Sequence, residues 1–402
     1  MRWLYFFIVV LLVSCNSDSG SKFEIGADER KIVIEHPQNY DSLISTRDLL
    51  KEVSYISLDT DSFVLGKPRK ILEFNDRILV HDQMKKVLAI YDFDGHFKGL
   101  VGNKGDGPNE QKGVTDFDID YDTETLVIYS RGDLSFLVYD HNFTLKKKVR
   151  IDLWAFQMSF LENGLLAFYS SFEQSLDNKN ISIFDLDGKK MNALMEFPRS
   201  GSYVPFDYSG FLKGNFYTYP LSSIIYKIDT DSRTSQEFIN IDFPGERDES
   251  KRFSQTEYLG KEWMQTQILS EFTIGSEMKE MLFFYSIDVS NIHTYSLGVK
   301  LKSGQIFSHA NMKHSSKKYS DAFSIFFFLG PYSIPDYSKK TDFYYGSTTS
   351  NAMYWYATSD DKNKILDEVK TIDPELAKVL SKTTDQSENT ILIKFKLKDT
   401  YE

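Results

Sequence analysis

The sequence predicts an all-β protein, a six-bladed β-propeller with four-stranded blades. Short apolar strands and turns recur in units of about 40 residues, which is the repeat length of propeller blades. Aromatic residues make up 15% of the chain, a composition that favours strands over helices. The turns are built on Asp, Asn and Gly, which tolerate positive φ or hydrogen-bond their own backbone.

The blade repeat is clearest in the first part of the chain. Four segments carry it: 67–102, 117–151, 156–197 and 206–241. Each has a strand, a tight turn and an outer strand in the same place, as in IYDFDGHF, VYDHNFTL, IFDLDGKK and YKIDTDSR. Strand patterns return at 281–312 and 321–357, which completes the six predicted blades.

Two segments interrupt the strand pattern with helical features. Met264, Ile268 and Phe272 recur every four residues, the spacing of one helix face, so a short helical insertion is expected at about 249–275. The segment DPELAKVLSKTT also has helical propensity, with Asp373 as a plausible N-cap.

One strand is left over at each end of the repeats. VSYISL occupies 53–58, before the first blade, and TILIKFKL ends the chain. A ring of blades has to be closed, because an open blade leaves unpaired edge groups. We therefore expect residues 31–402 to form one propeller domain, in which a strand from the N-terminal end completes the last blade.

The first residues have the three-part form of a secretory signal. Arg2 gives a positive charge, residues 4–13 are apolar, and Ser14 and Cys15 follow. The apolar run is too short to span a bilayer. Leu-Val-Ser-Cys resembles a bacterial lipobox, so we expect a signal peptide at 1–14, lipidation of Cys15 and a polar, flexible tether at 15–30. An ordinary signal with a chance cysteine is the alternative.

Three segments together resemble a known family. They are VSYISLDT at 53–60, the turn GDGPNE at 105–110 and the final strand ENTILI at 388–393. They are similar to six-bladed β-propeller lipoproteins of Bacteroidota, relatives of the NHL-type propellers. That family's turn reads close to Gly-Gln-Gly-Pro-Gly-Glu-Tyr, and here Asn109 and Gln111 replace the later Gly and the Tyr. The resemblance implies architecture and location more than a particular chemistry.

The net charge of the chain, −11, excludes some partners. Nucleic acids and anionic membrane surfaces both require basic patches, so we expect no nucleic-acid partner. The expected location is the outer membrane or the cell surface, through the lipid anchor, with the periplasmic-facing leaflet as the alternative. Cys15 is the only cysteine, so lipidation leaves none for a disulfide or a metal site.

The glycine-rich stretch GNKGDGPNEQKG, at 102–113, superficially resembles a phosphate loop. A P-loop would need Gly-Lys followed by Ser or Thr and a helix. Here Asp106 follows Lys104 and Gly105, strand residues follow Gly113, and Asp106 and Glu110 would repel an anion. The stretch therefore predicts an inter-blade connection. It would lie on a face of the ring where ligands approach, which makes Asp106 and Glu110 candidate ligand-binding residues.

Two further sets of side chains are candidates for ligand binding. Asp116, Asp118 and Asp120 alternate with apolar residues, so their carboxylates share one side of a strand near the rim or the central channel. Solvated edge carboxylates are favoured over a cation site, because no calcium-loop pattern is present. Late aromatic residues, among them Tyr332 and Tyr337, lie beside Gly and Pro and are candidate sugar-stacking rings, although blade cores need the same residues.

Three functions are compatible with these features. The leading one is a non-catalytic binding module for a glycan, a peptide or an envelope protein. The second is a metal-dependent hydrolase or lyase with a site in the central channel. The third is a structural or signalling subunit without a small ligand. The sequence contains no catalytic motif that we can assign, so enzyme status is unsupported and no catalytic residue, metal or cofactor is predicted.

Overall fold

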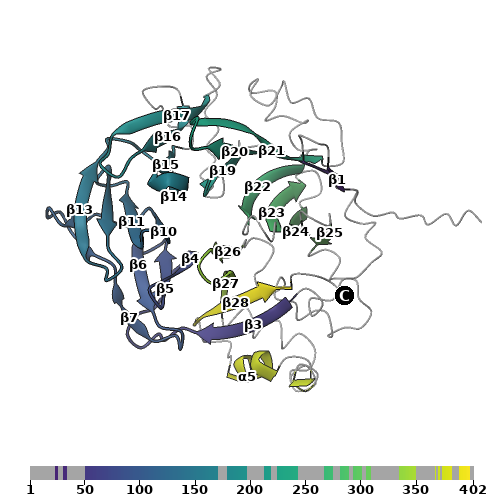
Figure 1. Ribbon diagram of the computed structural model, residues 1–402. Helices are drawn as coiled ribbons and strands as arrows, with labels where there is room; N and C mark the ends of the chain where they lie inside the picture. The colour runs from purple at the N-terminus through teal and green to yellow at the C-terminus, as the bar shows by residue number, and fades with distance from the viewer. Residues whose placement is uncertain are drawn as a thin grey trace, which may run out of the picture.

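The protein is a ring of antiparallel β-sheets in a computed structural model (Figure 1). The structure describes residues 23–25, 30–33, 50–170, 179–196, 212–218, 224–242, 267–274, 281–288, 293–300, 305–308, 335–349, 367, 370–371, 374–382 and 389–398. An all-β propeller with four-stranded antiparallel blades is thereby confirmed.

Five of the sheets have four strands each. The first is β4 (Pro68–Phe74), β5 (Arg77–Asp82), β6 (Val87–Tyr91) and β7 (Phe97–Leu100). The second is β10 (Asp116–Asp120), β11 (Thr125–Ser130), β12 (Ser135–Tyr139) and β13 (Leu145–Arg150). The third is β14 (Gln157–Phe160), β15 (Leu166–Tyr169), β16 (Lys179–Phe184) and β17 (Lys190–Glu196). The fourth is β22 (Gln267–Ile274), β23 (Met281–Asp288), β24 (His293–Lys300) and β25 (Gln305–Ser308). The fifth is β26 (Asp336–Ser338), β27 (Phe343–Thr349), β28 (Thr390–Leu397) and β3 (Leu50–Ser57).

The expectation of six four-stranded blades is therefore wrong in its count, since the described residues form five. The remaining large sheet has six strands: β18 (Leu212–Lys213), β19 (Phe216–Thr218), β20 (Ile224–Asp229), β21 (Thr234–Asp242), β2 (Arg30–Val33) and β1 (Phe23–Ile25). It is larger because β2 pairs in parallel with β21, and β1 pairs with β2. The N-terminal segment thus covers an edge that would otherwise be open.

The ring is closed by strands from opposite ends of the chain, as predicted. β28 pairs antiparallel with β3, with Ile393 opposite Tyr55 and Ile391 opposite Ser57. The two strands lie side by side at the base of Figure 1. Just beyond the last paired residues, Ser57 and Ile391, Leu58 N donates a hydrogen bond to Thr390 O at 2.9 Å. The closing blade therefore contains residues separated by more than three hundred positions.

The turns between strands follow the sequence chemistry. Asn75 and Asp76 join β4 to β5 and both have positive φ, 47° and 54°, the backbone conformation of a two-residue type I′ hairpin. After β6, the Asp92 carboxylate accepts hydrogen bonds from the backbone of Asp94 and His96, at 3.1 and 2.9 Å. The same Asp-centred turn recurs after β12 and β16, at Asp140 and Asp185. These turns explain the repeated phrases in the sequence.

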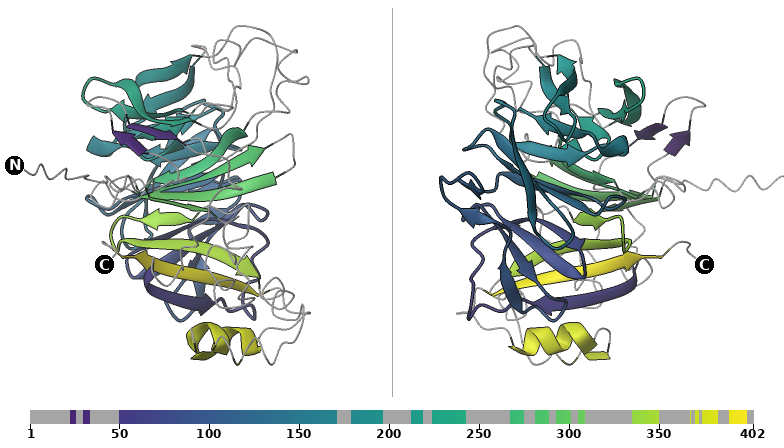
Figure 2. Two further views of the ribbon diagram at one scale, coloured as in Figure 1. Left: turned by 90° about the vertical axis from the view of Figure 1, so that its right-hand side faces the viewer. Right: turned by 60° about the vertical axis from the view of Figure 1, so that its left-hand side comes forward.

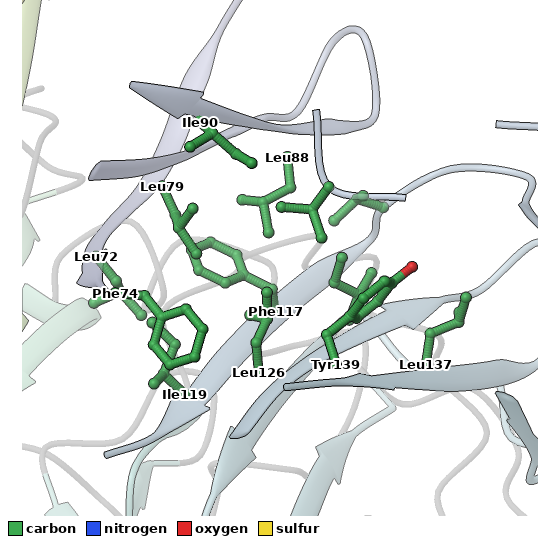
Figure 3. Close-up of a cluster of buried hydrophobic side chains, with 13 residues drawn as sticks. Leu72, Phe74, Leu79, Leu88, Ile90, Phe117, Ile119, Leu126, Leu137 and Tyr139 are labelled. Atoms are coloured by element: carbon green, nitrogen blue, oxygen red, sulfur yellow. The ribbon is translucent and has the colours of Figure 1, made fainter. Parts of the chain in front are cut away.

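The core lies between neighbouring blades rather than inside any one of them. One cluster joins Leu72 and Leu79 of the first blade to Phe117 and Leu126 of the second (Figure 3). The other face of the second blade packs on the third through Phe136 and others. Both faces of the first three blades are therefore buried, which is why their middle strands are nearly continuous apolar runs instead of alternating ones.

The helical expectations had opposite outcomes. The predicted insertion at 249–275 is wrong over 267–274, because those residues form β22, which pairs with β23 along its whole length. Strand pairing overrides a four-residue apolar spacing that is only weakly helical. Residues 249–266, including Met264, lie outside the described residues. The helix near the C-terminus is confirmed as α5 (Pro374–Lys382), which lies outside β3 and buries Leu376, Ala377 and Leu380 (Figure 2). Its proposed cap, Asp373, is outside the described residues.

The closing strand gives a stability prediction. Ile56 of β3 is buried in the cluster that joins the closing blade to the first blade, whereas Ser54 on the same strand is exposed. Ile56→Ala should lower the free energy of unfolding by about 2–4 kcal/mol, measured by urea denaturation, because it leaves a cavity at this junction. Ser54→Ala should change it by less than about 0.5 kcal/mol. Equal effects of the two substitutions would contradict the role assigned to β3.

Candidate functional site

The innermost strands of neighbouring sheets are linked by side chains around the ring axis. These inner strands are β4, β10, β14, β18, β22 and β26. Asp116 Oδ2 accepts from Met158 N at 2.8 Å, and Asp118 Oδ2 accepts from Phe160 N and from the Ser159 hydroxyl, each at 2.8 Å. Two carboxylates of β10 therefore satisfy backbone donors on the open edge of β14.

Hydrogen bonds from backbone N–H groups to side-chain oxygens also join other pairs of inner strands. Asp336 Oδ2, on β26, accepts from Ile71 N of β4 at 2.8 Å. Ser159 Oγ, on β14, accepts from Gly214 N next to β18 at 2.7 Å. An inner strand is the edge strand of its own sheet, so these acceptors replace the hydrogen bonds that a further strand would supply.

Lysines balance the carboxylates along the axis. Lys70 Nζ lies 3.4 Å from Asp116 and 3.8 Å from Asp118, and Lys213 Nζ lies 3.1 Å from Asp336. Burial alone would lower the pKa of Lys70, but the negative charges of Asp116, Asp118 and Asp336 outweigh it and raise that pKa above its usual value. The lysine therefore stays charged, and the carboxylates stay paired.

A cavity of about 420 Å³ opens at the end of the ring where β4, β10 and β14 begin. We call it the basic cavity, because six cationic side chains line it against one carboxylate, Asp116. The cations are Arg69, Lys70, Lys86, Lys112, Arg131 and Lys213. In a chain with a net charge of −11, this concentration of positive charge creates a local field that attracts anions.

The rim cations differ from the deep ones in their partners. Within the described part of the chain, neither Lys86 nor Arg131 forms an ion pair, and Lys112 meets only Asp106, at 3.5 Å across open solvent. Both lysines are exposed. The charge of Lys70 is already used by Asp116 and Asp118, so Lys86, Lys112 and Arg131 are the side chains that can contact an incoming anion.

Two glycines let the rim lysines sit close to the loop backbone. A Cβ at Gly113 would lie 3.0 Å from Lys86 Cβ, and its φ of 156° is unfavourable for other residues. A Cβ at Gly132 would lie 2.9 Å from Lys112 Cβ. Val114 N also donates to Lys86 O at 2.8 Å, which ties the β5–β6 turn to the loop before β10. The lysines therefore project from closely packed, mutually supported turns.

An aromatic shelf borders the cavity beside these cations. The Arg131 guanidinium lies 4.8 Å from the Trp154 ring centre and 4.4 Å from that of Phe156. Trp154 remains 48% exposed. The Tyr129 hydroxyl donates to Leu153 O and accepts from Ala155 N, so the backbone on both sides of Trp154 is fixed. The backbone that carries the ring is held in place, while about half of the residue faces solvent.

His81 lies in the wall of the cavity and is almost fully buried. Its Nε2 lies 3.3 Å from Val114 O, which assigns the proton to Nε2 and leaves a lone pair on Nδ1. Nδ1 has no hydrogen-bond partner among the described residues. Burial lowers the pKa of His81 despite the opposing charge of Asp116, so the ring is neutral at neutral pH.

The candidate residues from the sequence are dispersed rather than gathered in one site. Asp116 lines the basic cavity, and Asp118 lies below it on the same strand, but both are acceptors for the next blade. Asp120 instead caps the β10–β11 turn by accepting from Asp122 N and the Thr123 hydroxyl. The three carboxylates therefore have structural roles and do not converge on a cation.

The remaining candidates are also accounted for. The stretch 102–113 connects the first two blades, as predicted, and forms the short parallel pair β8 (Asn103–Lys104) and β9 (Glu110–Gln111). Glu110 accepts from Gly107 N at 2.8 Å, while Asp106 is exposed. Tyr337 donates to Asp342 at 2.9 Å and packs on Tyr344, away from the cavity. Cys15 and Tyr332 lie outside the described residues.

One group of described side chains is close enough to hold a cation. Ligand atoms of Asp92, Asp94 and His96 lie within 4.8 Å of one another in the exposed β6–β7 turn. Asp92 is already engaged, because its carboxylate pairs with Lys98 at 2.7 Å and accepts from the backbone of the turn. Those hydrogen bonds and Lys98 lower the pKa of Asp92 in spite of some desolvation. The cluster is explained by turn formation.

Sequence reasoning did not identify the basic cavity. Its cations come from separate turns and strand starts of three sheets and from the loop before β10, and each looks like an ordinary surface residue in the sequence. One feature of the sequence does point to the cavity: Lys112 and Gly113 end the glycine-rich stretch that superficially resembles a phosphate loop. The carboxylates of Asp106 and Glu110 argued against an anion there, but the structure places Lys112 and Gly113, and neither carboxylate, in the cavity wall.

The whole ring corresponds to a known sequence family. The family described as "Domain of unknown function (DUF4934)" matches residues 30–396. The chain belongs to this family. The DUF4934 match begins at β2 and ends within β28, so it includes the closing strand β3. No curated protein matches the sequence.

Solved structures of similar fold come from Bacteroides. An exported protein of Bacteroides fragilis is 17% identical, with a TM-score of 0.68, over 92% of this DUF4934 chain and 99% of its own. A DUF4221 family member from Bacteroides vulgatus is 10% identical, with a TM-score of 0.49, over 88% and 98% of the two chains. The first likeness supports the fold at full length. No helix in the described part of the chain has the length and apolarity needed to cross a membrane.

The cross-blade acceptors can be tested on β10. Asp118→Ala removes the acceptor for Phe160 N and Ser159, so we expect a loss of about 1–3 kcal/mol in the free energy of unfolding by urea denaturation. Asp122→Ala removes an exposed carboxylate nearby and should change it by less than about 0.5 kcal/mol. If Asp118→Ala is as stable as wild type, the carboxylate is not needed to join β10 to β14.

Proposed function

We propose that this protein is a non-catalytic binding module that takes an anionic ligand in the basic cavity. The observation that carries the proposal is the set of three cationic side chains at the cavity rim, Lys86, Lys112 and Arg131, of which Lys86 and Arg131 form no ion pair with a described residue. A preorganised group of cations on short, interlocked turns binds anions without first having to gather the charges. Lys86, Lys112 and Arg131 supply the contacts at the rim.

The alternative of a metal-dependent hydrolase in the channel has less support. Such an enzyme would draw on carboxylates near the axis, and among the described residues Asp116, Asp118 and Asp336 lie there. Each accepts a hydrogen bond from the backbone of the next inner strand, and each has a lysine beside it. A divalent cation would have to displace the lysines and break the links between blades.

The location of this module rests on the sequence and on its relatives. We place it in the cell envelope, held at the outer membrane or cell surface by lipid on Cys15, because of the lipobox-like Leu-Val-Ser-Cys and the exported relative from Bacteroides fragilis.

Anion binding can be measured with simple polymers. Isothermal titration calorimetry should detect binding of an acrylate oligomer, with an affinity that falls steeply as NaCl rises, and no binding of uncharged dextran. The double variant Lys86→Gln with Arg131→Gln should weaken binding about tenfold or more, because two direct cationic contacts are lost.

A matched variant controls for the change in net charge. Lys146→Gln with Lys378→Gln removes two exposed lysines, on β13 and α5, outside the cavity wall. This control should bind the acrylate oligomer like wild type. If both double variants lose affinity equally, the binding is a general effect of charge, and the basic cavity is not the site.

A further inference from the structure

We propose that the anion recognised by the basic cavity is carried on a hydroxylated sugar ring, so that the ligand class is an oligosaccharide of uronic acids. This inference rests on the proposed anion-binding function and adds two features of the cavity that charge alone does not explain. They are the exposed, fixed ring of Trp154 and the unpartnered Nδ1 of His81.

The Nδ1 atom of His81 needs a hydrogen-bond donor, and we infer that the ligand supplies it. With the proton on Nε2 facing Val114 O, Nδ1 is an acceptor, and it is buried in the cavity wall without a partner among the described residues. A carboxylate or a fully ionised phosphate has no donor to offer. A sugar hydroxyl does, and it satisfies a group whose burial is otherwise costly.

The partly exposed Trp154 ring is complementary to a flat, partly apolar ligand surface. Arg131 lies over the indole ring, and 48% of the residue remains exposed at the cavity border. Because its flanking backbone is bonded to the Tyr129 hydroxyl, the indole offers a preformed platform. The C–H face of a pyranose packs on such a ring while its hydroxyls remain free for polar partners.

The rim cations come from separate turns, which favours several single charges over one dense charge. Lys86 lies in the β5–β6 turn, Lys112 in the loop before β10 and Arg131 directly after β11, and the carboxylate of Asp116 also lines the cavity. A compact multiply charged group such as a phosphate would approach that carboxylate. An oligosaccharide with one carboxylate on each ring distributes its charges along its length, as the rim cations are distributed.

The comparison of three ligands tests this inference separately from anion binding. The probes are a trimer of galacturonic acid, an acrylate oligomer with the same number of carboxylates, and the neutral galactose trimer, all titrated into the full chain by calorimetry at one salt concentration. We expect the uronide to bind at least about tenfold more tightly than the acrylate and the neutral trimer to bind weakly. If the acrylate binds as tightly as the uronide and still depends on Lys86 and Arg131, the sugar inference fails and the anion-binding function stands.

Two substitutions locate the recognition. His81→Gln keeps an amide N–H near Val114 O but removes the Nδ1 acceptor, so it should weaken the uronide about tenfold and leave the acrylate unchanged. Trp154→Ala should also weaken the uronide selectively. His81→Asn retains a polar atom near the Nδ1 position and should lose less. Equal losses for uronide and acrylate would assign these residues a structural role and overturn the inference, as would tighter binding of uridine monophosphate than of the uronide.

Discussion

Side-chain oxygens from one inner strand complete the hydrogen bonding of the next, and the integrity of the ring depends on this contact. Each inner strand is the free edge of its own sheet, and its backbone donors point toward an axis where no further strand can fit. Asp116 and Asp118 supply acceptors to β14, and Asp336 supplies one to β4. Apolar packing between blades holds the sheets face to face, and these side-chain contacts join their inner edges.

Carboxylates placed at the axis impose a second requirement. Several negative charges in a partly buried space repel one another unless cations accompany them, and Lys70 and Lys213 meet that need. The charges of the ring are therefore arranged in two layers: balanced charge along the inner strands, and at the rim Lys86 and Arg131, which form no ion pair with a described residue. The anion site that we propose lies at the end of this balanced layer.

The parts of the fold that sequence predicted are those with local causes. Asp-centred turns such as Asp92 and Asp140, the blade period, the C-terminal helix and the leftover strand VSYISL all follow from short-range chemistry or from the need to pair an edge. The spacing of Ile268 and Phe272 wrongly predicted a helix, because a four-residue apolar repeat in a strand-rich context carries little helical preference. These residues form a strand that pairs with β23. The alternation in DFDIDYD, residues 116–122, correctly placed Asp116 and Asp118 on one face. Their partners, Met158 N and Phe160 N, are some forty residues away, and no local pattern reveals them. The basic cavity is harder still, since Lys86, Lys112 and Arg131 become neighbours only when two blades are packed together.

The pairing of β3 with β28 differs from the other pairings within four-stranded blades in the length of chain between its strands. The intermediate blades are made of consecutive strands, so each of them can form from local contacts as soon as its own residues are available. The closing blade cannot, because β28 is the last strand of the chain and its partner precedes every intermediate blade. Without this pairing the sheets form an open arc, in which β3 and β28 carry unpaired backbone groups along their facing edges. A partner that covered those edges would have to act on the open arc, because the closed ring no longer offers them.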